Sequence, residues 1–279
     1  MFKAEEHEFS TFWFETFIET FHWQGLSFLG FWMGSLVAEE IRKKQHSFPF
    51  FELTGEPGSG RYAMLEFCWK LMGQDEYLGF DLFNASVSNQ RRVFTQASSM
   101  PIVLLDAEEE AGEKGKHARR KRIDDLKLFY DGCHSNDDRM VKGGIVFVLD
   151  VSKFQSPAFL ARVVHCHTVT DHHNQGSQFF ANFLDRQTAA KVGGLQEVVA
   201  QNKTEILEAY FTVYDELVPM FRNAGVRNAR HVKNHAQVAA CGHALSVIFP
   251  SMDQDEKTQL AFYLIEEALK REGMEVRYV

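Results

Sequence analysis

Apolar residues in the middle of the chain form short unbroken runs that alternate with stretches of helical spacing. The runs are FPFFELTG from residue 48, PIVLLD from residue 101 and GIVFVLDV from residue 144. Between them, residues 61–73 and 123–131 carry apolar positions at helical spacing, which indicates amphipathic helices. Unbroken apolar runs are typical of strands buried on both faces, and their alternation with helices predicts a parallel sheet.

Helical patterns also dominate both ends of the chain. Residues 9–45 are dense in aromatic side chains and end in the amphipathic stretch AEEIRKKQ, which predicts packed helices. A polar segment at 171–178 precedes four further helices. Asp253 is the expected N-cap of the last of them. These four are expected at 179–192, 195–222, 229–249 and 254–272. The predicted organisation is an N-terminal helical collar at 1–47, an α/β core at 48–178 and a C-terminal helical bundle at 179–279.

Composition places the chain among globular proteins. It has 279 residues, 45% of them hydrophobic and 24% charged, with a net charge of -8. That charge argues against a surface that binds nucleic acid everywhere, so any polyanion must meet a local basic patch. The cysteines form no CxxC pair and the first residues lack the order of a secretory signal, so we expect a cytoplasmic protein. Polar residues and glycines interrupt the apolar stretch 20–38, which therefore predicts a packed helix and no membrane span.

A glycine-rich stretch follows the first apolar run. Residues 55–62, GEPGSGRY, match the phosphate-loop pattern G-x-x-x-x-G-K-[ST] in their glycines and differ at the last two positions. Backbone amides can surround a phosphate only where side chains do not obstruct, and the following helix adds positive potential. An ordinary strand-to-helix turn is the alternative. The pattern predicts a P-loop NTPase core whose phosphate-binding residues are Gly55, Glu56, Pro57, Gly58, Ser59, Gly60, Arg61 and Tyr62.

The two departures from the pattern affect different functions. Arg61 keeps a positive charge, but its planar guanidinium is longer than an ammonium group and harder to place between phosphates. Tyr62 replaces the short hydroxyl that holds Mg²⁺, and a phenol oxygen lies too far out for that role. Nucleotide binding is therefore compatible with the sequence, whereas the placement of the metal is in question.

Acidic side chains end the other two apolar runs. Asp106 follows the second run, with Glu108 and Glu109 just beyond it. A carboxylate at such a strand end can hold Mg²⁺ or its waters and another can orient the attacking water. A solvated acidic loop is the alternative. Asp150 ends the third run, where a carboxylate would repel phosphate unless it binds metal or is protonated, and both a structural and a functional role stay open.

A basic segment follows the acidic strand end. Clustered cations of this kind neutralise several phosphates and give salt-dependent DNA binding, while a solvated loop is the alternative. The segment KGKHARRKR supplies Lys114, Lys116, Arg119, Arg120, Lys121 and Arg122.

Histidines gather in RVVHCHTVTDHH, where strand alternation puts His165 and His167 on one face. The zinc interpretation would also use Cys166, His172 and His173 and would need Cys133 and His134 to complete the site. Ordinary packed and exposed histidines are the alternative. A second group, His231, Asn234 and His235, is expected on a helix, where packing competes with a nucleotide contact from Arg230 or Lys233.

Taken together, four segments carry a family resemblance that covers most of the chain. They are SFPFFELTGEPGSG, GFDLFNASVSNQRRVFTQASSMPIVLLD, GGIVFVLDV with FLARVVH, and RHVKNHAQVAA. The chain resembles the ATPase region of primase-helicases carried by phages and mobile elements, related to superfamily-three helicases within the AAA+ group. The family pattern has lysine at Arg61, serine or threonine at Tyr62 and asparagine near Asp150, and this sequence departs at all three.

The resemblance implies ATP and Mg²⁺ as cofactors, DNA as a partner and a homo-oligomeric ring. It implies Asp106 for the metal and Glu108 for the water. It also implies that Arg162 reaches the site of a neighbouring subunit as an arginine finger. The preferred function is a nucleotide-binding, ATPase-like component of mobile-element DNA replication, with hydrolysis driving translocation if Arg61 suffices. The alternative is a decayed P-loop protein that assembles or binds DNA without catalysis. No acidic constellation of a primase precedes residue 48, so a primase is expected elsewhere.

Overall fold

A five-stranded parallel sheet lies at the centre of the molecule. The computed structural model describes residues 9–76, 79–81, 94, 99–105, 125–131, 141–152, 154, 156–169 and 175–274. Its strands are β1 (Phe50–Gly55), β2 (Phe80–Asp81), β3 (Ile102–Leu105), β4 (Ile145–Leu149) and β5 (Val163–Thr168). Their spatial order is β2-β3-β4-β1-β5, and each neighbouring pair is parallel. The parallel sheet expected from the apolar runs is therefore present, while the short β2 was not predicted.

The first strand, β1, has a neighbouring strand on each side. β1 lies between β4 and β5, with Thr54 opposite Leu149 on one side and His167 on the other. The chain leaves β1 toward the distant strand β2 and later crosses from β4 over β1 to β5. Connections thus diverge at β1, and ligands of open α/β sheets bind outside the carboxyl ends of strands at such a point.

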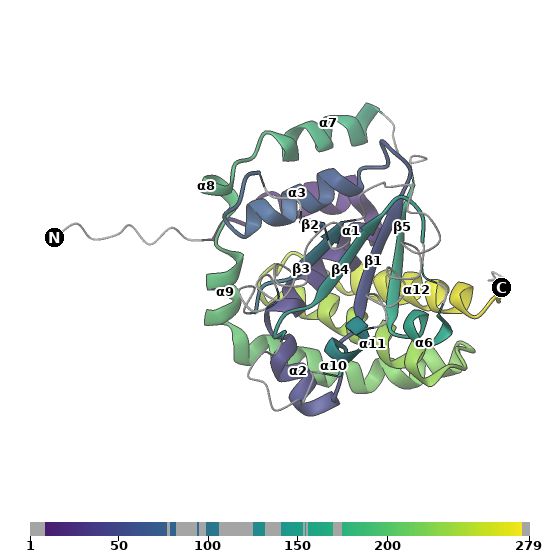
Figure 1. Cartoon of the computed structure of the whole chain (residues 1–279). Helices are drawn as coiled ribbons and strands as arrows, with labels where there is room; N and C mark the ends of the chain where they lie inside the picture. Colours follow the sequence, from purple (N-terminus) through teal and green to yellow (C-terminus); the bar gives the residue numbers. More distant parts are fainter. Residues whose placement is uncertain are drawn as a thin grey trace.

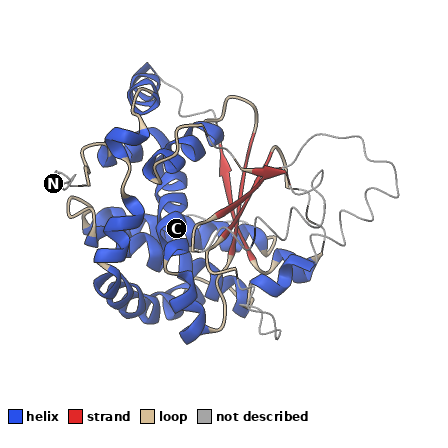
Figure 2. Ribbon diagram, turned by 60° about the vertical axis from the view of Figure 1, so that its left-hand side comes forward, coloured by secondary structure: helices blue, strands red, loops and turns tan. Residues whose placement is uncertain are grey.

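Most helices cover one face of the sheet (Figures 1 and 2). Helices α1 (Phe14–Leu36), α3 (Arg61–Leu71) and α11 (Ala229–Ala244) share a large buried cluster with inward side chains of the strands. A smaller cluster covers the other face, with α6 (Pro157–Leu160) and the 3-10 helix η1 (Leu126–Phe129). The helix expected at 123–131 is therefore a short 3-10 turn in its described part.

Close contact between α1 and α11 depends on glycine. A Cβ on Gly30 would lie 2.7 Å from backbone atoms of Gly242, and one on Gly34 would lie 2.3 Å from the Cys241 sulfur. Helix backbones approach this closely only where no side chain intervenes. The apolar stretch 20–38 is thus part of the core, and none of the described helices has the length and hydropathy of a membrane span.

The C-terminal region is helical, as the spacing predicts, but its helices are more broken than expected. The region 179–192 contains the end of α7 (Gln175–Asp185) and all of α8 (Ala189–Val192), and 195–222 divides into α9 (Leu195–Gln201) and α10 (Lys203–Asn223). The stretch 229–249 holds α11 and the 3-10 turn η2 (Leu245–Val247). Asp253 caps α12 (Gln254–Arg271) through a capping box with Glu256, which confirms the predicted N-cap.

Residues from all three predicted segments meet in the large cluster. Trp13 and Phe17 of the N-terminal segment, Phe51 of β1 and Phe249 after η2 are all fully buried there. A second N-terminal helix, α2 (Ala38–Gln45), leads into β1. The chain boundaries assigned to the collar, core and C-terminal bundle stay a prediction.

Candidate functional site

The glycine-rich loop lies at the carboxyl end of β1 and leads directly into α3. Gly58 and Gly60 have φ angles of 86° and 83°, a left-handed conformation that side chains with a Cβ rarely adopt. The amide of Ser59 donates to the carbonyl oxygen of Glu56 at 3.0 Å, which closes a turn within the loop. The sequence therefore places a tight bend between a central strand and a helix, as the glycine spacing requires.

Short hydroxyl side chains hold this loop against the neighbouring strand. Ser59 Oγ and Thr168 Oγ1 lie 2.7 Å apart, and Thr168 Oγ1 donates to the carbonyl oxygen of Thr54 at 3.0 Å. A Cβ on Gly55 would come within 2.2 Å of Thr168 Oγ1 and 2.4 Å of Ser59 Oγ. Only glycine fits at position 55, so the loop is fixed to β5 rather than standing free.

The loop ends at the N-terminus of α3, which attracts anions. The first amide groups of a helix have no intrahelical acceptor, and the helix dipole makes this end positive. No acidic side chain occupies the first turn of α3 to compensate that potential. The N-terminus of an 11-residue helix at a glycine-rich bend is thus suited to hold phosphate oxygens.

Arg61 is the buried cation of the site. Its side chain is 4% exposed and forms an ion pair with Asp150, which follows β4 and is 41% exposed. Within the described part of the chain, Arg61 Nε and Nη1 are buried without a hydrogen-bond partner. The guanidinium carbon lies 4.7 Å from the centre of the Tyr62 ring. Arg61 is therefore already paired with a carboxylate, yet it retains two unused donor positions.

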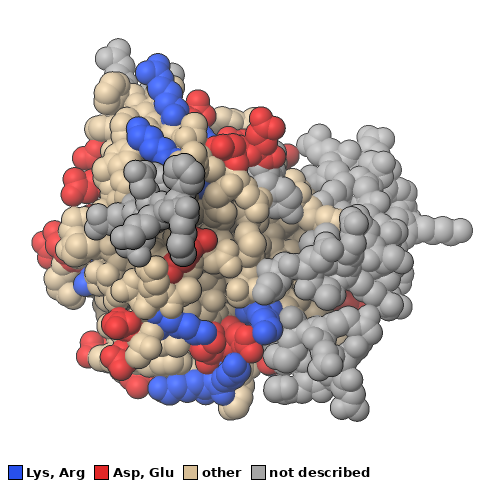
Figure 3. Space-filling model, turned by 90° about the vertical axis from the view of Figure 1, so that its left-hand side faces the viewer, with Lys and Arg blue, Asp and Glu red and all other residues tan. Residues whose placement is uncertain are grey.

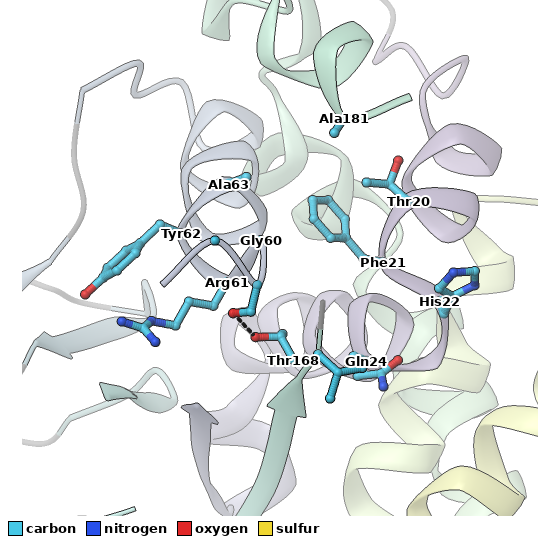
Figure 4. A pocket seen from close by; sticks show the side chains of 13 residues that line it. Thr20, Phe21, His22, Gln24, Gly60, Arg61, Tyr62, Ala63, Thr168 and Ala181 are labelled. Atoms are coloured by element: carbon cyan, nitrogen blue, oxygen red, sulfur yellow. Dashed lines mark hydrogen bonds between the residues drawn. The ribbon is translucent and has the colours of Figure 1, made fainter. Parts of the chain in front are cut away.

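Tyr62 does not fill the loop. Its side chain is 40% exposed and extends away from Gly60 beside Arg61 (Figure 4). The phenol thus leaves the bend open, but it also places no short hydroxyl at the start of α3. The first turn of the helix offers nothing in the role of the serine or threonine that binds Mg²⁺ in phosphate loops.

A cavity of about 360 Å³ opens at the loop, and Arg61 and Tyr62 are among the residues that line it. Phe21, Thr20 and Ala181 line it opposite Gly60 (Figure 4), and a Cβ on Gly60 would lie 3.5 Å from the Phe21 ring. Helix α1 is interrupted here, because His22 adopts φ 49° and ψ -144°. Sequence analysis missed this cavity, since its walls come from α1, the loop, the end of β5 and α7.

Of the other predicted catalytic residues, Arg162 is the one within the described chain, and it is not brought to this loop. Arg162 lies just before β5, where its carbonyl accepts from the Phe50 amide at 2.9 Å. Arg162 therefore lies at the amino-terminal end of the strands. The loop follows their carboxyl end, and the length of β1 between the two is roughly 16 Å. The Arg162 guanidinium lies 5.2 Å from the Tyr130 ring. A role of Arg162 in the site of a neighbouring subunit stays a prediction.

Two groups of predicted residues lie outside the described residues. The first comprises the carboxylates Asp106 and Glu108. The second comprises the basic residues Lys114, Lys116, Arg119, Arg120, Lys121 and Arg122. On the face shown in Figure 3, described basic and acidic side chains lie among one another without forming a continuous basic area.

The histidines of β5 belong to a polar network. His165 and His167 both contact Thr54 Oγ1, at 2.8 and 3.0 Å, which confirms that they share one face of the strand. Burial would raise the pKa of Glu267, but His165 and Lys270, which lie 3.8 and 2.7 Å from its oxygens, outweigh the burial and lower that pKa. No group of three or more potential metal ligands occurs among the described residues, while Cys133, His134, His172 and His173 lie outside them.

The second histidine group lies on α11, and its side chains are buried. Asn234 accepts from the Tyr130 hydroxyl and donates to the carbonyl oxygen of Ala161, both at 2.7 Å. His235 is fully buried, and burial lowers its pKa to about 3. His231, which is 7% exposed, contacts Glu272. Asn234 and His231 thus connect α11 to Tyr130, to Ala161 and to Glu272 after α12, as the packing interpretation of this motif predicts.

The chain matches a known protein in fold but none in sequence. No protein-family model and no curated protein sequence matches the chain. The chain resembles a solved structure described as "SCCmec type IV Cch - active helicase", with a TM-score of 0.66 and 13% sequence identity. The match covers 94% of this chain and 51% of that one, so this chain spans about half the length of that protein. The fold is therefore helicase-like.

Proposed function

We propose that the chain is a nucleotide-binding component of a mobile-element DNA replication complex of the helicase type. One observation carries this proposal: a glycine-rich bend, fixed to β5, joins the central strand to the N-terminus of α3 at the edge where ligands of α/β sheets bind. The likeness of fold to a protein described as an active helicase supports the class of complex.

The loop and the cavity suggest how a nucleotide lies. The phosphates would accept hydrogen bonds from backbone amides between Gly58 and Tyr62 at the start of α3. The base would enter the cavity beside Phe21, where an aromatic ring can stack on it. Arg61 Nε and Nη1 are buried donors without a partner in the described chain, and an anion on the loop would supply one. The chain's own groups therefore fit a nucleotide.

A hydrolytic Mg²⁺ site fits the loop less well. Tyr62 points away from the bend, so α3 supplies no short hydroxyl to the ion. In an active ATPase the ion would neutralise phosphate charge, and Asp106 is the proposed ligand, with Glu108 on the attacking water. Because the described loop lacks the complementary ligand, we propose binding without efficient turnover.

A second candidate function is ATP hydrolysis coupled to DNA translocation in a homo-oligomeric ring. The helicase-like fold favours it. Arg162 also lies away from the glycine-rich loop of its own chain, which is required of an arginine that serves a neighbouring subunit. The basic segment 114–122 would then contact DNA through phosphates. The Arg61–Asp150 pair favours the non-hydrolytic form, because it occupies the cation that would otherwise meet the phosphates.

Phosphate release separates the two candidates. We expect purified protein with ATP, Mg²⁺ and single-stranded DNA to release no more phosphate than an Asp106→Ala variant does, because the first turn of α3 has no short hydroxyl for the ion. The measurement is a continuous phosphate assay with and without DNA. Release that exceeds the Asp106→Ala control and rises with DNA would contradict the non-hydrolytic form and support the translocating enzyme.

A further inference from the structure

We infer that Asp150 makes this loop select a nucleoside diphosphate over the corresponding triphosphate. The inference rests on the proposed nucleotide-binding function and concerns the specificity of the same site. It starts from a pairing that joins two positions 89 residues apart in sequence, Arg61 at the start of α3 and Asp150 at the end of β4.

The pair lies where the phosphate chain would end. Phe21 lies in the cavity wall on one side of Gly60, and the Arg61 side chain, which also lines the cavity, extends to the other side (Figure 4). A nucleotide with its base in the cavity runs its phosphates along the loop toward Arg61. The main chain of Asp150 is also part of this edge, since its carbonyl oxygen accepts from the Gly55 amide at 3.3 Å. The last phosphate of a long chain therefore approaches the Asp150 carboxylate.

The charge at this end of the loop is already balanced. The ion pair between Arg61 and Asp150 joins one positive and one negative group, so it leaves no net positive charge for a further phosphate. The unpartnered Nε and Nη1 atoms still allow the guanidinium to donate to one phosphate from its buried position. This arrangement serves the shorter chain, whose phosphates contact backbone amides and the remaining Arg61 donors.

A third phosphate meets repulsion without compensation. It adds negative charge beside a carboxylate, and like charges at close range in a partly buried site are unfavourable. A magnesium ion would normally offset this repulsion, but Tyr62 directs no ligand toward the loop. An uncharged amide at position 150 would leave Arg61 free to meet that phosphate. Asp150 is thus the residue that sets the preferred length of the phosphate chain.

The test compares ADP and ATP on the full chain by calorimetric titration, with Mg²⁺ and separately with EDTA. We expect the unmodified protein to bind ADP at least tenfold more tightly than ATP under both conditions. Asp150→Asn, which removes the charge and nearly keeps the shape, should reduce that ratio below threefold. Glu76→Gln is the matched control, since it removes the same charge from an exposed position after α3 and should keep the ratio.

The outcomes separate this inference from the function on which it rests. Equal or tighter binding of ATP by the unmodified protein, or an unchanged ratio in Asp150→Asn, overturns the inference alone. Failure of every protein to bind either nucleotide overturns the nucleotide site as well. A second measurement needs no variant. Pyrophosphate should compete with ADP for the unmodified protein at least tenfold better than tripolyphosphate does. The reverse order overturns the selectivity even if Asp150→Asn does not fold.

Discussion

Replacement of Arg271 by alanine is expected to lower the free energy of unfolding by about 3 kcal/mol, because it leaves a buried carboxylate without its partner. Arg271 Nη2 donates to Glu52 Oε2 at 2.6 Å, and Glu52 is 0% exposed in the middle of β1. His165 Nε2 is 3.9 Å from the same oxygen, too far for a hydrogen bond. Urea denaturation at pH 7 measures the effect.

An ion pair on the surface provides the control. Lys43→Ala removes a side chain that is 65% exposed and paired with Glu39, which is 25% exposed, and exposed pairs contribute about 0–1 kcal/mol. The double variant Glu52→Leu with Arg271→Met should recover most of the loss, since apolar replacement of a whole buried pair is often neutral. If Arg271→Ala costs no more than Lys43→Ala, the buried pair does not stabilise β1 against α12.

Replacement of Gly55 by alanine is expected to weaken ADP binding at least thirtyfold, about 2 kcal/mol. The added Cβ would lie 2.8 Å from the backbone oxygen of Thr168 as well as too close to two hydroxyl groups. Because backbone cannot move aside as a flexible side chain does, the loop must shift away from β5 and its amides lose their common direction. Calorimetric titration with ADP measures the loss.

Another glycine controls for a general effect of the substitution. Gly225 lies in the turn between α10 and α11 with φ 100°, and a Cβ there would meet no atom within 4 Å. Gly225→Ala should cost stability through its left-handed backbone but leave ADP affinity unchanged. Thermal melting of both variants checks that they are folded. Equal ADP affinity in Gly55→Ala and the unmodified protein would mean that the loop is not the binding element.

Much of the sheet could be predicted because its strands carry unmistakable apolar runs. β1, β3 and β4 coincide with these runs, and the alternation of His165 and His167 indicated the face of β5. The two-residue strand β2 has too short a pattern to be recognised. Helix breaks at Asn202 and after α11 were missed, because periodicity continues across them and only the local backbone shows the interruption.

The site could be predicted only in its local part. The bend from Gly55 to Gly60 follows from glycine spacing between a strand and a helix, and it needs no distant residue. The Arg61–Asp150 pair needs the strand order, since β4 becomes the neighbour of β1 only in the folded sheet. In the sequence, Arg61 and Asp150 are two separate departures from a family pattern. In the structure they form one ion pair, so each side chain balances the charge of the other.

A structure determined at saturating ADP tests the nucleotide site most directly. The account predicts diphosphate oxygens within hydrogen-bond distance of backbone amides between Gly58 and Tyr62, with the base beside Phe21. ADP bound elsewhere, or a loop that remains free of it at a concentration that saturates binding in solution, would contradict the account.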